Sequence, residues 1–225
     1  MITNRFPYSK IKRKRAEGKR LYDTESGYLP SVTTVLGATK PDEDKQALQK
    51  WRNRVGEAEA QQITNEAANV GTLMHKNLED WLIADSYTRK DNMIHRIAGR
   101  MADTIIKNIN SDLDEVWGTE VNLYYPGLYA GTTDLVGVWK GKQTICDFKQ
   151  TNKPKKREWI TDYFLQGCLY AAAHNELFDT EIKSVAIFMC SRDCQFQLFE
   201  ITDNDFEYYS KLAAERIEKY YQQET

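Results

Sequence analysis

GTTDLVGVWKGKQTICDFK, residues 131–149, is the stretch that decides the fold. β-Branched and aromatic residues flank the Lys140-Gly141 dipeptide, which suits a tight turn, so the stretch predicts a β-hairpin. If Trp139 pairs with Lys142, counting outward by equal steps places Asp134 directly opposite Asp147. Two facing carboxylates in a half-buried sheet repel each other, so this pairing indicates that a cation lies between them.

The same strand adds an ammonium group. Asp147 and Lys149 are two residues apart, so their side chains leave the same face of the strand, while Cys146 and Phe148 point to the other face. Two acids form an oxygen-rich site that favours Mg²⁺, with Mn²⁺ as a substitute, over zinc. A lysine beside such an ion can orient a metal-bound water or stabilise charge on a phosphate. The spacing alone fits equally well a surface hairpin with an incidental Asp and Lys.

Outward from the hairpin, the chain of 225 residues predicts an α+β fold, with a mixed central β-sheet flanked by helices and a helical N-terminal portion. We expect one domain over residues 1–225, divided into a basic arm (1–28), a helical portion (29–112) and a βββαββα core (113–225). Helical spacing of apolar residues indicates helices, and alternation indicates strands. The expected helices are 44–55, 57–83, 92–108, 156–176 and 204–221, and the expected strands are 116–125, 129–139, 142–150, 184–190 and 195–201.

The net charge of −2 argues at first against a nucleic-acid partner, but the charge is unevenly distributed. Residues 1–20 contain eight Lys or Arg against the single acid Glu17, a balance of +7, which leaves −9 for the remainder. A second basic run, residues 149–157, follows the hairpin. A solvated surface loop also explains such a run.

The four cysteines lack the paired spacing of a zinc site, and no apolar run is long enough to span a membrane. We therefore expect a soluble protein with reduced thiols in the cytoplasm of a bacterial or phage-infected cell, without a membrane partner. A mitochondrial transit peptide is a weaker interpretation of the basic N-terminus, because Pro7 and Gly18 interrupt it.

A family resemblance joins several motifs in order. Gly131-Thr-Thr-Asp134, Asp147-Phe-Lys149 and the Gln166/Tyr170 pair resemble the motif set of the PD-(D/E)XK nuclease superfamily, and the segment ending in His75 matches the histidine motif of its RecB-like branch. Residues 29–36 and 129–134 are similar to the mitochondrial genome maintenance exonucleases and their phage relatives. The resemblance covers roughly residues 20–202 and implies a restriction-endonuclease-like core.

The resemblance implies a role for each matching position. The metal ligands would be His75, Asp134, Asp147 and the main-chain carbonyl of Phe148, and Lys149 would be the catalytic lysine. Glu120 lies where relatives carry an acid and would hold a second metal or an outer-shell water, although an ordinary strand residue fits as well. Gln166 and Tyr170 are four apart on one helix face, which in the family faces the active site and the DNA.

Several other residues are candidates for contact with DNA. The lysines of the second basic run lie between the Asp147 strand and the Gln166 helix, where a scissile strand would pass. A threonine pair near the N-terminus and a tryptophan could contact the backbone or stack on a base, although burial also explains the tryptophan. These candidates are Thr33, Thr34, Trp51, Lys153, Lys155 and Lys156.

The chain departs from part of the RecB-like branch in its cysteines. Members with an iron-sulfur cluster carry one cysteine near the N-terminus and three after the Gln/Tyr helix, whereas here no cysteine precedes Cys146 and only Cys190 and Cys194 follow the helix. We therefore expect no iron-sulfur cluster. The chain also lacks a Walker A loop, so unwinding would need a separate partner such as a helicase, and a polymerase or single-strand-binding protein are further candidate partners.

These observations favour a metal-dependent DNA exonuclease that hydrolyses phosphodiester bonds, acting on single-stranded DNA with free ends in replication, repair or recombination. Two alternatives remain open. A structure-specific endonuclease would share the fold and the chemistry, and a non-catalytic DNA-binding module would share the fold and the basic arm.

Overall fold

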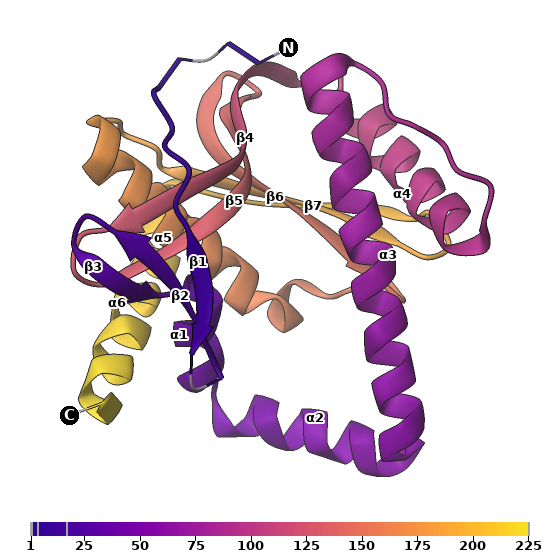
Figure 1. The fold of residues 1–225 in the computed structure, drawn as a ribbon, viewed down its shortest axis with the longest axis horizontal. Helices are drawn as coiled ribbons and strands as arrows, with labels where there is room; N and C mark the ends of the chain where they lie inside the picture. The colour runs from indigo at the N-terminus through magenta and orange to yellow at the C-terminus, as the bar shows by residue number, and fades with distance from the viewer. Residues whose placement is uncertain (1, 4, 17, 225) are drawn as a thin grey trace.

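The computed structural model describes residues 2–3, 5–16 and 18–224, which form two β-sheets surrounded by helices (Figure 1). Glu17, the acid of the basic arm, lies outside the described residues. The elements in chain order are β1 (Arg13–Ala16), β2 (Lys19–Thr24), β3 (Gly27–Pro30), α1 (Val32–Ala38), α2 (Asp42–Val55), α3 (Glu57–Ala84), α4 (Met93–Ile109), β4 (Leu113–Tyr125), β5 (Tyr129–Trp139), β6 (Lys142–Thr151), the 3₁₀ turn η1 (Arg157–Trp159), α5 (Thr161–Phe178), β7 (Ser184–Ser191), β8 (Phe196–Thr202) and α6 (Asp203–Glu224).

The larger sheet has the order β4-β5-β6-β7-β8 and is mixed, because β6 and β7 are parallel while the other neighbours are antiparallel. α5 is the crossover that parallel neighbours require. The predicted hairpin register is confirmed from Trp139–Lys142 to Leu135–Cys146. The predicted α+β class with a mixed central sheet flanked by helices is likewise confirmed.

The sheet divides just past the Leu135–Cys146 pair. Residues 129–133 of β5 pair only with β4, and residues 147–151 of β6 pair only with β7. The sheet therefore forks into a β4–β5 branch and a β6–β7–β8 branch, and Asp134 and Asp147 lie at the base of this fork.

Two apolar clusters cover the two faces of the larger sheet. Consecutive residues of the central strands alternate between them: Val136 and Ile145 belong to the cluster with α5 and α6, whereas Leu135 and Cys146 belong to the cluster with α3 and α4. This alternation follows from strand geometry, which points successive side chains to opposite faces of the sheet. α4 packs with a continuous buried stripe, which includes Ala98, Met101, Ala102, Ile105 and Ile109.

The basic arm is largely a folded sheet. β1, β2 and β3 form an antiparallel sheet, in which Arg13 pairs with Tyr22 and Tyr22 with Leu29. Tyr22 and Leu29 are buried with Ala130 of β5, so this small sheet is anchored on the larger one. Short strands of mixed composition carry little periodicity, and for this reason the sequence did not predict them.

The expected helix start at residue 156 is wrong, because α5 begins at Thr161. The side chain of Gln197 binds both main-chain groups of Lys155, accepting from its N–H at 2.7 Å and donating to its carbonyl at 2.8 Å. Arg157 donates to the carbonyl of Glu200 and to Asp205. These contacts with β8 and α6 hold the segment as a loop with one 3₁₀ turn, η1, whereas α2, α3 and α4 follow the predicted ranges closely. In the part of the chain that the structure describes, no helix is long and apolar enough to cross a membrane.

A buried histidine on α5 connects the N-terminal segment to the core. His174 is fully buried, with one ring nitrogen 2.9 Å from the Tyr8 hydroxyl and the other 2.8 Å from that of Thr180. Phe6 and Phe178 pack against its ring. Burial lowers the pKa of His174 to about 4, because the charged imidazolium would lose its hydration.

We predict that His174 makes the fold sensitive to acid. Since the pKa of His174 is lower in the folded chain than in the unfolded chain, stability is present at neutral pH and is lost as the pH falls toward 4. Relative to His174→Gln, the wild type should lose about 2 kcal/mol of unfolding free energy between about pH 7 and about pH 5. Urea unfolding of both proteins at each pH measures this difference. Parallel stability curves for the two proteins would contradict the prediction.

Candidate active site

A cavity of about 500 Å³ lies between the β4–β5 branch of the fork, α3, α5 and the small N-terminal sheet. Its lining includes the predicted residues His75, Glu120, Asp134, Gln166 and Tyr170. Asp147 and Lys149 are on β6, in the other branch of the fork, and Lys149 contacts Gln166 of the cavity lining. Side chains from five elements thus converge at this point.

Asp134 is held in place by groups from three elements. Its Oδ1 lies 3.2 Å from His75 Nδ1 on α3, and its Oδ2 accepts the main-chain N–H of Phe148 at 2.7 Å. Thr119 of β4 donates to the carbonyl of Asp134 at 2.9 Å. Burial favours the neutral acid, but His75, Lys149 and the Phe148 amide outweigh it, so the pKa of Asp134 lies below its ordinary value.

Asp147 and Lys149 form a buried ion pair on one face of β6, as the strand alternation predicts. Burial raises the pKa of Asp147 to about 6, although Lys149 opposes this. Burial also disfavours the charged form of Lys149, but Asp147 and Asp134 outweigh it and the pKa of Lys149 is raised. Lys149 is therefore an ammonium group at neutral pH, and it can donate hydrogen bonds but cannot accept a proton.

Glu120 projects toward Asp134 from an unusual main-chain conformation. Thr119 pairs with Leu135 and Val121 with Thr133, so Glu120 and Asp134 lie between the same two pairs. Glu120 has φ of 49°, in the left-handed region that few residues other than glycine adopt. Strain of this kind concentrates at functional sites, where it directs a side chain. Burial and the Asp134 charge raise the pKa of Glu120.

Three of the predicted ligands lie close enough together to hold a metal ion. One ligand atom from each of His75, Glu120 and Asp134 lies within 4.8 Å of the others, and two carboxylates with an imidazole fit a divalent cation such as Mg²⁺ or Mn²⁺. Within the described ranges Asp147 is outside this set, and its carboxylate pairs with Lys149. The roles of Asp147 and of the Phe148 carbonyl as ligands stay predictions, and the contact that the structure gives for the Phe148 main chain is its N–H to Asp134.

The predicted residues of α5 orient the lysine. Lys149 Nζ donates to Gln166 Oε1 at 3.4 Å, and Gln166 Nε2 donates to the Tyr170 hydroxyl at 3.2 Å. The ring of Tyr163 lies 4.8 Å from Lys149 Nζ. Gln166 and Tyr170 thus share one face of α5, as their spacing of four predicted, and this face adjoins the carboxylates, as the family resemblance implied.

The structure brings only one of the predicted DNA contacts into this cavity. Thr33 is exposed and lines it. The Thr34 hydroxyl lies 2.8 Å from that of Ser31 and accepts the Arg20 N–H at 3.3 Å, so it supports the start of α1. Trp51 is half-buried on α2, a helix with no buried residue among those described. Lys153, Lys155 and Lys156 are exposed on the loop after β6 and do not line the cavity.

Sequence reasoning missed the N-terminal wall of the cavity. Arg13 of β1 and Arg20 of β2 line it, together with Tyr22 and Ser31. The positive charge of residues 1–20 was the available signal, but it did not indicate which of eight cations would face the carboxylates.

Comparison with known proteins supports the motif assignment. The chain is 27% identical over 178 residues to mitochondrial genome maintenance exonuclease 1 of Xenopus tropicalis. The matched region makes up 75% of this chain and 50% of that relative. The mouse protein of the same name is 27% identical over 173 residues, which make up 73% of this chain and 50% of the mouse protein. The chain is related to these exonucleases. This relationship confirms the resemblance inferred from the motifs, and the chain spans about half the length of the curated relatives it matches.

No family model matches the chain. Among solved structures, a candidate exonuclease from Eubacterium rectale is similar with a TM-score of 0.44 and 12% identity, covering 69% of each chain.

Tyr170 reaches the cavity because residue 131 is a glycine. A Cβ at Gly131 would lie 2.6 Å from the Tyr170 ring and 2.7 Å from its hydroxyl oxygen. Tyr170 is itself buried, with 3% of its surface exposed, so it has little room to withdraw. The glycine of the Gly131-Thr-Thr-Asp134 motif therefore serves the packing of α5 on β5.

We predict that Gly131→Ala lowers the free energy of unfolding by about 1–3 kcal/mol, because the methyl group overpacks the Tyr170 ring. The matched control is Gly37→Ala on α1, where a Cβ would meet no atom within 4 Å. That control should leave stability unchanged or slightly raised, because alanine is the better helix former. Urea unfolding measures both variants, and a Gly131→Ala protein as stable as the wild type would refute the packing argument.

Proposed function

We propose that this chain is a metal-dependent DNA exonuclease that hydrolyses phosphodiester bonds from the free ends of single strands. The observation that carries the proposal is the convergence of His75, Glu120 and Asp134 beside the Asp147–Lys149 ion pair. The relationship to proteins named as exonucleases supports it. Its expected setting is DNA replication, repair or recombination in a bacterial or phage-infected cell.

His75, Glu120 and Asp134 would hold the divalent cation, with Asp147 as a further ligand. When bound, such an ion lowers the pKa of a coordinated water and neutralises charge on a phosphate. Asp134 is ready for this role, because its lowered pKa keeps it ionised.

Lys149 would hold the attacking water or a non-bridging phosphate oxygen by hydrogen bonds. Its raised pKa keeps the ammonium charge through the reaction, so it stabilises developing negative charge rather than removing a proton. Gln166 accepts one hydrogen of the ammonium group and thereby fixes where the others point. Tyr170 in turn accepts from Gln166 and fixes the orientation of its amide.

Replacing the lysine tests this chemistry. Lys149→Met keeps the length of the side chain and removes the charge, and Asp147→Asn keeps the shape of the acid. Each should lower the rate of cleavage of end-labelled single strands in Mg²⁺ by about 10²- to 10⁴-fold. Lys211→Met, an exposed position on α6, is the matched control and should cleave as the wild type does.

Metal and substrate controls complete this experiment. A chelator should abolish cleavage, and added Mg²⁺ or Mn²⁺ should restore it. Covalently closed single-stranded circles should remain intact, whereas cutting of circles would favour the endonuclease alternative. Full activity in both active-site variants would exclude this site as the catalytic centre.

The N-terminal wall suggests a salt test. If Arg13 and Arg20 neutralise phosphates in the cavity, the Arg13→Ala/Arg20→Ala protein should bind single strands more weakly, and its slope of log affinity against log salt should be smaller by about 1.4. Lys10→Ala/Lys12→Ala removes two cations from the same arm that do not line the cavity, so its slope should change less. Fluorescence anisotropy across a salt series measures both, and equal slopes for the two variants would show that only the total charge of the arm matters.

A further inference from the structure

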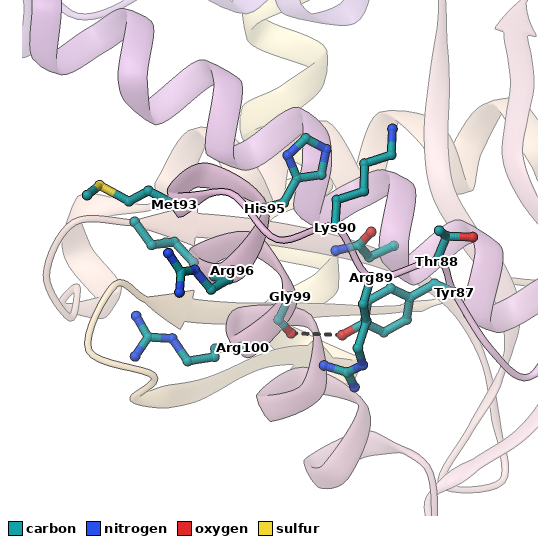
Figure 2. Close-up of a pocket in the computed structure, with 11 residues that line it drawn as sticks. Tyr87, Thr88, Arg89, Lys90, Met93, His95, Arg96, Gly99 and Arg100 are labelled. Carbon is teal, nitrogen blue, oxygen red and sulfur yellow. Dashed lines mark hydrogen bonds between the residues drawn. The ribbon is translucent and has the colours of Figure 1, made fainter.

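A second, strongly basic cavity lies on the other side of α3. It has a volume of about 460 Å³ and is lined by the α3–α4 connection, the first turns of α4 and Asn77 of α3 (Figure 2). Asn77 is two residues beyond His75, a rotation of about 200° around the helix, so the two cavities adjoin opposite faces of α3. The residues proposed for cleavage take no part in this second cavity.

The connection that forms the cavity is tied to α4. The Tyr87 hydroxyl donates to the carbonyl of Gly99 at 3.0 Å and to Asp103 at 2.6 Å. Arg89 makes a two-pronged contact with the same carboxylate, at 2.9 and 2.8 Å. The walls of the cavity are therefore preorganised, and Arg89 is neutralised by Asp103.

Three cations of the cavity remain poorly compensated. Among the described residues neither Lys90 nor Arg100 has an acidic partner, and the Asp91 carboxylate lies 3.6 Å from Arg96 with 92% of the Asp91 side chain exposed. An exposed pair of this kind contributes little. Among the residues that the structure describes, none that lines the cavity is acidic.

The placement of these cations is unfavourable for the isolated protein. Arg96 and Arg100 are four residues apart on α4, so like charges are neighbours on one helix face (Figure 2). The first turn of α4 holds His95 and Arg96 and no acid, at the end of the helix where its dipole favours negative charge. An anion in the cavity would relieve both repulsions.

We infer that this cavity is an accessory phosphate-binding site, in which Arg96, Arg100 and Lys90 hold phosphate groups of a DNA strand outside the cleavage site. Guanidinium groups suit phosphate because their N–H donors match its oxygens in pairs. The inference rests on the proposed action on DNA, which supplies a strand longer than the first cavity can hold. A nucleotide released by cleavage carries the same phosphate chemistry, so the test separates these two sources.

The test compares Arg96→Ala/Arg100→Ala with the wild type and with Lys107→Ala/Lys211→Ala, which removes two exposed cations outside both cavities. Binding of a long, labelled oligothymidylate is measured by fluorescence anisotropy in EDTA across a salt series. We expect the cavity variant to bind about tenfold more weakly and its salt slope to be smaller by about 1.4, while the control binds nearly as the wild type does. Cleavage of a short oligonucleotide in Mg²⁺ should be the same in all three proteins.

A second experiment measures the binding of thymidine monophosphate and of inorganic phosphate to the same proteins by calorimetric titration. Loss of their binding in the cavity variant, with unchanged affinity for the long strand, would assign the cavity to a free nucleotide phosphate and overturn the strand assignment. Unchanged binding of all three probes would overturn the phosphate site itself. If the wild type binds the long strand through Arg96 and Arg100 but cleaves no DNA, the nuclease proposal fails and the accessory site stands.

Discussion

The hydrogen bond from the Phe148 main chain to the Asp134 carboxylate lies at the centre of this structure. Regular pairing of β5 with β6 ends at Leu135–Cys146, one residue from Asp134 and two from Phe148, and beyond that pair each strand pairs only with its outer neighbour. A continuous ladder would have satisfied the main chain without any side chain. Because a carboxylate takes this N–H instead, the sheet opens and a site can form inside it.

The two acids at the base of the fork have pKa values shifted in opposite directions. Asp134 lies beside His75 and the Phe148 amide, and its pKa is lowered, whereas burial dominates at Asp147 and raises its pKa to about 6. Carboxylates whose surroundings move their pKa values apart are suited to different roles. The half-buried ammonium of Lys149 interacts with both acids, so removing one of these groups would leave the others without a compensating charge.

Much of the central sheet could be predicted, because its signals are local. The Lys140-Gly141 turn fixes the register of the hairpin, and a period of two assigns Asp147 and Lys149 to one face. The Gln166/Tyr170 spacing likewise predicted that these residues share one face of α5, and the family resemblance implied that this face adjoins the active site. The N-terminal sheet and the start of α5 at Thr161 were not predictable, since each depends on contacts with residues far along the chain, such as Ala130 for the sheet and Gln197 for the loop.

The sequence by itself therefore determined which groups could do chemistry here and which of them share a strand or a helix face. Covalent spacing and secondary-structure periodicity are enough to assign the shared faces, whereas the candidate roles of the helix residues came from the resemblance of their motifs to a nuclease family. Only the tertiary structure decided that the sheet forks at Asp134, that His75 and Glu120 meet this carboxylate, and that Arg13 and Arg20 close the cavity. It also placed the cations of α4 in a second cavity across α3. These decisions depend on how α3, α5 and the small sheet pack on the core, and packing is a property of the whole chain rather than of any one segment.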